Sequence, residues 1–234
     1  MKRILAVFAH PDDESLAAGG FLASRSEAGD EVTVISATWG EGTVRADELR
    51  DAARVLGATR VRLLGYADRG VPESAPGRAR LVDAPLDEAA GHLAEQLVEL
   101  APDVVVTHDR LGGATGHEDH RRAHEVVVRA LGLASAPATG PGTELLLATH
   151  PHSALPRLEP LARPGRALRT VDDAEVDEVL DVRPWLTTKL RAIAAHRSEV
   201  ERGALAALIA RMTSGEQEAL LGVEFYARAH GTLG

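Results

Sequence analysis

The feature that most constrains this chain is a short apolar run that stops at a cluster of charged residues. Residues 4–9 read Ile-Leu-Ala-Val-Phe-Ala, and residues 10–14 read His-Pro-Asp-Asp-Glu. The run has no polar alternation, which favours a strand covered on both faces, as in a parallel sheet. Apolar residues at a helical spacing follow the cluster. His10, Asp12 and Asp13 are therefore expected in a turn between a strand and a helix, where open α/β sheets bind ligands.

Strand-like and helix-like segments alternate after this turn. Further strands are predicted at residues 31–38, 60–64, 103–108 and 144–149, and helices at residues 14–23, 45–57, 85–100 and 117–131. Strand–helix–strand units at this spacing imply right-handed crossovers. The predicted fold class is therefore α/β, with a doubly wound, mostly parallel sheet and helices on both faces.

The alternation weakens beyond residue 150. A polar strand is predicted near 176–182, and helices are predicted at about 184–201 and 203–212. We interpret residues 151–234 as a C-terminal elaboration of a core formed by residues 1–150. A length of 234 residues suits one domain of this class rather than two.

Two segments contain Pro, Gly or Arg at positions that disfavour regular structure. Residues 66–84 carry two glycines and two prolines between Gly70 and Gly77, and are predicted to form a loop or lid over the site. Residues 151–175 form the second predicted loop. These loops are expected to decide which substrate is accepted.

The composition favours a small-molecule partner. A formal net charge of -9 and a pI near 5.6 argue against binding to nucleic acid or to an anionic membrane surface. No apolar run approaches the length of a membrane span. The chain has no cysteine, so any metal must be held by His and carboxylate groups, and a cytoplasmic location is expected. The oligomeric state stays open, a homo-oligomer included.

Four residues from two of the turns are of types that bind metals. His10 and Asp13 come from the first turn, while His117 and His120 follow the strand at 103–108. Parallel strands bring their carboxyl ends to one edge of the sheet, where these side chains should meet. Two imidazoles and one carboxylate, with open positions for water, make a catalytic metal site. Taken singly, each turn could instead be a capped and solvated helix start.

Two motifs give the chain a resemblance to a known family. Residues 9–14, Ala-His-Pro-Asp-Asp-Glu, and residues 116–120, Gly-His-Glu-Asp-His, resemble those of the PIG-L/LmbE family of zinc-dependent N-acetylglucosaminyl deacetylases. Weaker similarities follow in the same order at residues 38–41, 45–49, 56–57, Asp68, the 189–198 segment with His196, and residues 224–225. The resemblance covers most of the chain and implies a Rossmann-like fold.

The resemblance also implies an activity and a ligand set. The expected reaction is removal of an N-acyl group, chiefly N-acetyl, from a small amino-sugar conjugate. His10, Asp13 and His120 would bind Zn²⁺, with Fe²⁺ as an alternative metal. Asp12 would be the general base, and His117 would stabilise the transition state.

These roles fit elementary chemistry. Zinc lowers the pKa of a bound water to ~7, and that water can attack an amide carbonyl that the metal polarises. Asp12 could take the proton and pass it to the leaving amine. A protonated His117 would face the oxyanion, an interaction typically worth ~3 kcal/mol. Asp119 is expected to hold the His117 ring in place, although a first-turn helix charge is an equal interpretation.

Other polar residues are candidates for contact with the substrate. Arg45 and Asp68 could reach sugar hydroxyls or a phosphate from the rim of the pocket, with solvated surface charge as the alternative. His196 is a candidate through the family match alone. One departure concerns Thr115, since some relatives carry a tyrosine there that helps to polarise the carbonyl.

The remaining histidines are interpreted as having no chemical role. His108 and His124 are expected to be structural or at the surface. His150 and His152, beside Pro151, are expected to be exposed loop residues, with a place in the pocket lining as the alternative. Glu14 is expected to be a capping carboxylate.

Two other classes share parts of this pattern. Non-haem iron oxygenases use two histidines and a carboxylate, but on an all-β fold with a different spacing. Receiver domains place an acidic pair after the first strand, but they need a lysine after the fifth, and this chain has only Lys2 and Lys189. Within the hydrolase interpretation, the alternatives are an amidase of mycothiol-type thiol conjugates and a natural-product deacylase.

Overall fold

A single sheet runs through the molecule. The computed structural model describes residues 1–134, 143–162, 165 and 167–229. Within them the strands form one sheet in the order β3-β2-β1-β4-β5-β7-β6. The strands are β1 (Arg3–Phe8), β2 (Glu31–Thr38), β3 (Arg60–Tyr66), β4 (Val104–His108), β5 (Glu144–Thr149), β6 (Glu178–Asp181) and β7 (Val223–Arg228). The first five pair in parallel, which confirms the predicted α/β class with a mostly parallel sheet.

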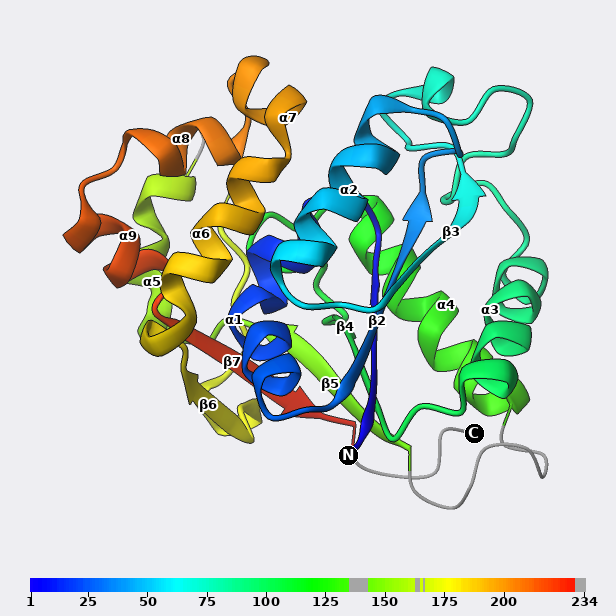
Figure 1. The fold of residues 1–234 in the computed structure, drawn as a ribbon, viewed down its shortest axis with the longest axis horizontal. Coiled ribbons are helices and arrows are strands. Elements are labelled where there is room, and N and C mark those ends of the chain that lie inside the picture. Colours follow the sequence, from blue (N-terminus) through cyan, green and yellow to red (C-terminus); the bar gives the residue numbers. More distant parts are fainter. Residues whose placement is uncertain (135–142, 163–164, 166, 230–234) are drawn as a thin grey trace.

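Helices cover both faces of this sheet (Figure 1). One face carries α1 (Asp13–Glu27), α2 (Val44–Val55) and α6 (Leu186–Ala195), and the other carries α3 (Leu86–Leu100) and α4 (Glu118–Ala134). Shorter helices gather beside α6: α5 (Leu155–Leu158), α7 (Arg197–Glu201), α8 (Leu205–Arg211) and α9 (Ser214–Leu221). Single 3₁₀ turns lie at Pro72–Ser74, His152–Ala154, Glu159–Leu161, Asp173–Glu175 and Arg183–Trp185. Among the described residues, no helix combines the length and apolar character needed to cross a membrane.

The opening apolar run is buried on both faces, as its lack of alternation predicts. Leu5 and Val7 belong to the core cluster under α3 and α4. Ile4, Ala6 and Phe8 belong to the cluster under α1, α2 and α6. Successive side chains of a strand point to opposite faces, so a strand packed between two helical layers must be apolar at every position.

The C-terminal segment extends the core sheet. β7 pairs antiparallel with β5 on one side and with β6 on the other. β6 lies within the strand predicted near 176–182, whereas the predicted elements include neither β7 nor α9. A capping box at Thr213 and Glu216 begins α9 and was the readable signal for it.

One predicted C-terminal helix is interrupted. The segment expected to be helical over 184–201 breaks at His196, whose ψ of 66° is not helical, and continues as α7. Of the predicted loop at 151–175, residues 163, 164 and 166 lie outside the described residues. The predicted loop at 66–84 contains the last residue of β3 and one 3₁₀ turn.

The sheet order places a crevice between β1 and β4. Successive crossovers lead from β1 towards β3 on one side and from β4 towards β5 on the other. The order of strands therefore reverses at the β1/β4 boundary, and the loops at their carboxyl ends diverge there. These two loops carry residues 9–12 and 109–117, which include the two motif turns.

Two glycines in α1 allow the C-terminal segment to approach closely. An added Cβ at Gly20 would lie 2.3 Å from Cβ of Val182, and one at Gly19 would lie 3.0 Å from Cγ of Lys189. Val182 is fully buried. The close contact between α1 and the segment that follows β6 therefore requires glycine, which has no side chain, at position 20.

We predict that Gly20→Ala lowers the free energy of unfolding by about 1–3 kcal/mol, because the new methyl group overpacks the contact with Val182. The measurement is urea denaturation followed by circular dichroism. Gly91→Ala in α3 is the matched control, since an added Cβ there has no heavy atom within 4 Å. That variant should be neutral or stabilised by up to ~1 kcal/mol, and equal effects of the two substitutions would contradict the packing explanation.

Candidate metal centre

The first motif turn holds an unusual backbone conformation. Asp12 has φ 117° and ψ -29°, a combination that costs free energy for any residue with a side chain. Its N–H donates to the Glu14 carboxylate at 3.0 Å. Arg45 also donates a hydrogen bond to the carbonyl of Pro11. Side chains from outside the turn thus help to hold it in a shape that presents His10, Asp12 and Asp13 together.

The second motif turn is built around Asp109 and three glycines. The Asp109 carboxylate accepts the N–H groups of Leu111 and Gly113 at 3.0 and 2.9 Å. Gly112, Gly113 and Gly116 all have positive φ values, which a side chain would oppose. This compact loop delivers His117 just before α4 and His120 in its first turn.

The two turns bring the expected metal ligands together. Asp13 Oδ2 lies 3.2 Å from His10 Nδ1, and Asp13 Oδ1 lies 3.3 Å from His120 Nε2. The ring centroids of His10 and His120 are 5.2 Å apart, and that of His117 lies 4.8 Å from that of His10. Ring nitrogens of all three histidines lie within 4.8 Å of one another, close enough to share a cation.

Hydrogen bonds indicate which nitrogen atoms are available. His120 Nδ1 lies 3.1 Å from the carbonyl of Gly112, so it donates there and leaves a lone pair on Nε2, the usual state of a histidine ligand. His108 also adjoins Asp13, at 3.3 Å, but its Nε2 accepts the N–H of Ala9 at 3.2 Å. That lone pair is already used. The contacts therefore favour His10, Asp13 and His120 over a set containing His108, although His108 is buried at the centre and is not a surface residue.

Carboxylates surround His10. Asp119 Oδ2 lies 3.1 Å and Asp68 Oδ2 lies 3.4 Å from its Nε2. Burial favours the neutral ring, but hydrogen bonds to Asp119 and Asp13 prevail and raise the pKa of His10 to about 10. The carboxylates around His10 thus favour one positive charge at the point where the imidazole and carboxylate groups meet, and here the proton on His10 supplies it. This donor set suits a borderline divalent cation such as Zn²⁺ or Fe²⁺, which would take the place of the proton.

Asp12 stands beside this group and contacts a buried arginine. Arg45 lies 3.1 Å from Asp12 Oδ1 and 3.2 Å from Glu199 Oε1, and it is only 5 % exposed. Arg45 therefore lies behind Asp12 and not at the pocket rim, where the sequence analysis expected it. Burial raises the pKa of Asp12 to about 7, against the opposing effect of the Arg45 charge. The carboxyl group can therefore both accept and return a proton near neutral pH.

Glu14 and His196 form a buried pair behind the same turn. His196 Nε2 lies 2.9 Å from Glu14 Oε1, and both side chains are almost completely inaccessible. Glu14 thus holds the backbone of Asp12 with one oxygen and His196 with the other. This burial does not favour a direct contact between His196 and a substrate. Glu14, interpreted from sequence as a simple cap, instead links His196 to the backbone of Asp12.

His117 is oriented by the backbone of Asp119. The N–H of Asp119 donates to His117 Nδ1 at 3.2 Å, whereas the Asp119 carboxylate is 3.9 Å away. That carboxylate instead contacts His10 and accepts the N–H of Arg69. Burial and the charges of His10 and His120 lower the pKa of His117 to about 4. These contacts favour a neutral ring with its proton on Nε2 over the protonated ring expected from sequence.

The other expected residues take different places. Asp68, thought to be at the rim, is 8 % exposed and adjoins His10. His150 is half-buried at a second cavity, His152 is exposed, and His124 Nδ1 lies 3.0 Å from the carbonyl of His108. His108 ends a parallel strand at the same sheet edge from which His10 was predicted to reach the site. Its position after a predicted strand was therefore a signal in the sequence that it lies near the metal centre.

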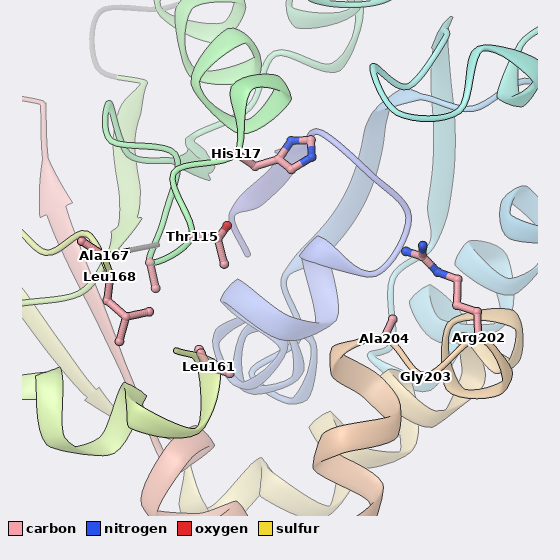
Figure 2. A pocket seen from close by; sticks show the side chains of 9 residues that line it. Thr115, His117, Leu161, Ala167, Leu168, Arg202, Gly203 and Ala204 are labelled. Carbon is pink, nitrogen blue, oxygen red and sulfur yellow. The ribbon is translucent and has the colours of Figure 1, made fainter. Parts of the chain in front are cut away.

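An open cavity of about 380 Å³ adjoins this centre at His117, and we call it the outer cavity. Its lining includes Thr115, His117, Leu161, Leu168 and Arg202. Figure 2 shows Arg202 on the opposite side of this cavity from Thr115 and Leu161. Arg202 pairs with Glu199, which also holds Arg45. No sequence motif marked Arg202, because its place depends on how α7 folds back over the sheet edge.

Known proteins share this sequence pattern and this fold. The family model described as PIG-L, GlcNAc-PI de-N-acetylase, matches residues 5–131. The 1D-myo-inositol 2-acetamido-2-deoxy-alpha-D-glucopyranoside deacetylase of Thermomonospora curvata is 34% identical over 276 residues, covering 100% of this chain and 92% of the relative. The enzyme of the same name from Rhodococcus erythropolis is 33% identical over 278 residues, with the same coverage. The N,N'-diacetylchitobiose deacetylase of Pyrococcus horikoshii has the same fold, with a TM-score of 0.67 at 21% identity, over 97% of this chain and 84% of that one.

We predict that His120→Ala abolishes tight zinc binding, because Asp13 and His10 alone leave the cation with two protein ligands. The affinity loss should exceed the ~10–100-fold that changes in the surrounding hydrogen bonds cost. Zinc content after dialysis and competition with a chromogenic chelator measure it. His152→Ala, at an exposed histidine, is the control. His108→Ala should keep zinc, and His10→Ala should lose it. The opposite results would show that His108, and not His10, binds the metal with Asp13 and His120.

Proposed function

This chain belongs to the PIG-L family, and we propose that it is a hydrolase that removes the N-acetyl group from a glucosaminyl conjugate. The observation that carries the proposal is the meeting of the two motif turns, in which Asp13 contacts His10 and His120 and Asp12 directly precedes Asp13. Such a site contains a base, a cation-binding group and an open cavity, which together suffice for amide hydrolysis. The relatives' names supply the amino-sugar part of the substrate.

We assign the metal to His10, Asp13 and His120 and expect Zn²⁺, with Fe²⁺ as the alternative. When bound, such an ion lowers the pKa of a water molecule to ~7 and polarises an amide carbonyl. The neighbouring carboxylates of Asp68 and Asp119 contact His10 and fix its ring. In this role they resemble the carboxylates that orient histidine ligands in other metal sites.

Asp12 moves the protons in this proposal. Its carboxylate lies next to the ligand Asp13 but makes its own contact with Arg45 at 3.1 Å. It accepts a proton from the attacking water and delivers a proton to the leaving amine, so one group acts first as base and then as acid. The Arg45 guanidinium stabilises the carboxylate form and limits its rotation.

His117 stabilises the oxyanion that develops on the substrate carbonyl. With Nδ1 occupied by the N–H of Asp119, the Nε2–H is free to donate into the outer cavity. A single donor of this kind is typically worth ~3 kcal/mol at the transition state. Thr115 lines the same cavity at the position where some relatives carry a tyrosine. Of Thr115 and His117, we therefore assign oxyanion stabilisation to His117 only.

The inositol named in the relatives makes an inositol-linked amino sugar the first conjugate to test. An amidase of mycothiol-type thiol conjugates and a natural-product deacylase are the alternatives within the same chemistry. A cytoplasmic location and a homo-oligomeric state stay predictions.

We predict that the zinc-reconstituted protein releases a primary amine from at least one member of a panel of N-acetylglucosaminyl conjugates, and that a chelator stops the release. The panel includes inositol, simple alkyl and thiol-bearing aglycones, and the readout is a fluorogenic amine reagent. Release from one member identifies the aglycone. Failure of every member with zinc shown to be bound would refute the deacetylase assignment.

We predict that Asp12→Asn keeps its zinc and loses about 10²–10⁴-fold in kcat, since the amide cannot accept the proton. Zinc content and steady-state kinetics are measured on the same sample. Glu95→Gln, at an exposed position of α3, is the control for loss of one negative charge. A variant with full turnover would remove Asp12 from the mechanism.

A further inference from the structure

A second cavity adjoins the metal ligands, and we call it the inner cavity. Its volume is about 130 Å³, and Asp13, His108 and His120 form part of its wall. The rest of its lining is mainly apolar and comes from α1, α5, α8, α9 and β7. Examples are Leu16, Ala17, Leu158, Ile209, Leu220 and Phe225.

The inner and outer cavities adjoin. Ala114, Thr115 and Leu161 line both of them. The two cavities differ in the residues of the metal centre that line them. His117 lines only the outer cavity, whereas Asp13 and His120 line only the inner one. A substrate carbonyl bound between His117 and His120 would therefore adjoin both cavities. The larger outer cavity would take the amine substituent, the sugar, which leaves the inner one for the acyl substituent.

Lys189 and Glu224, two charged residues of the inner cavity, are paired with each other. Lys189 Nζ lies 2.6 Å from Glu224 Oε1, and the two side chains are 2% and 3% exposed. Glu224 also accepts the N–H groups of Gly20 and Phe21, each at 2.8 Å, and the hydroxyl of Tyr226 at 2.7 Å. The charges of Lys189 and Glu224 therefore neutralise each other, and the Lys189 ammonium is not free to bind a second carboxylate. The cavity suits an uncharged hydrocarbon.

The volume is much larger than an acetyl methyl group requires. Cavities of about 150 Å³ lined by Leu, Ile and Phe bind benzene, a molecule of six carbons. At 130 Å³ the inner cavity has room for a chain of similar carbon count. An acetyl group would leave most of this apolar surface without a partner.

We propose that the inner cavity binds the acyl chain of the substrate, and that the enzyme hydrolyses N-acyl groups of about four to six carbons in preference to acetyl. This inference rests on the proposed amide hydrolysis and names its acyl substrate class. Each buried methylene should raise kcat/KM by up to about fourfold. The gain should end when the chain exceeds the cavity, because further carbons then meet its wall.

The test is amine release from one glucosaminyl conjugate carrying acetyl, butanoyl, hexanoyl, decanoyl or succinyl groups. We expect kcat/KM for butanoyl and hexanoyl to exceed that for acetyl by about tenfold or more, with decanoyl falling again. Succinyl, which matches butanoyl in length but ends in a carboxylate, should be slower than butanoyl. A maximum at acetyl would overturn the inference and leave the deacetylase standing, whereas no release from any conjugate would refute the proposed function itself.

A substitution that fills the cavity gives a second, independent result. Ala17→Leu projects a larger side chain from α1 into the inner cavity and should lower the ratio of hexanoyl to acetyl kcat/KM by about tenfold or more. Ala28→Leu, the same change at the exposed end of α1, should leave that ratio unchanged. If Ala17→Leu does not fold, Leu16→Phe serves at the adjacent half-buried position.

Binding without turnover supplies a readout that does not depend on activity. Hexanoate and acetate are titrated into the zinc-loaded protein by calorimetry. We expect hexanoate to bind at least about tenfold more tightly than acetate, and Ala17→Leu, but not Ala28→Leu, to remove the difference. Equal affinities in the wild-type protein would contradict an acyl site in the inner cavity.

Discussion

The parallel pairing of β1 with β4 is the constraint on which the rest of the site depends. Ile4, Leu5 and Ala6 face Val104, Val105 and Val106 in register. This pairing brings together two turns that are about a hundred residues apart, so that His10 meets Asp119 across 109 positions of sequence. Because both strands are buried on both faces, a slip in register would disturb close packing against both helical layers at once. The core of the sheet thus fixes the geometry of a polar centre that it does not itself contain.

The centre concentrates charge where little water is present. Burying several carboxylates together is costly unless each one finds a positive partner or a hydrogen-bond donor. Two kinds of compensation are visible. On the cavity side, imidazole rings and the cation they can hold balance Asp13, Asp68 and Asp119. Behind the turn, Arg45 and His196 balance Asp12 and Glu14. The strained backbone of Asp12 persists because groups from both sides determine its position.

Sequence reasoning succeeded where function follows from strand ends. His10, Asp13, His117 and His120 could be placed together because a parallel sheet collects the carboxyl ends of its strands at one edge. Arg45 and His196 could not be placed in this way. Whether a side chain reaches the rim or lies behind the turn depends on how α2 and α6 pack, and a spacing pattern carries no such information. His117 shows a related limit, since its charge is set by neighbours that come from another turn.

The position of β7 has a consequence for how the chain folds. β7, the last of the described strands in the sequence, lies between β5 and β6. Glu224 on β7 accepts the N–H groups of Gly20 and Phe21, across 204 and 203 residues. Contacts of such separation raise the contact order of a domain, and loop closure over long distances slows folding. During synthesis, β5 must wait with an unpaired edge until β7 leaves the ribosome, and an open apolar edge is a template for aggregation. Efficient production of this protein should therefore depend on protection of that edge by chaperones or by slow, cool expression.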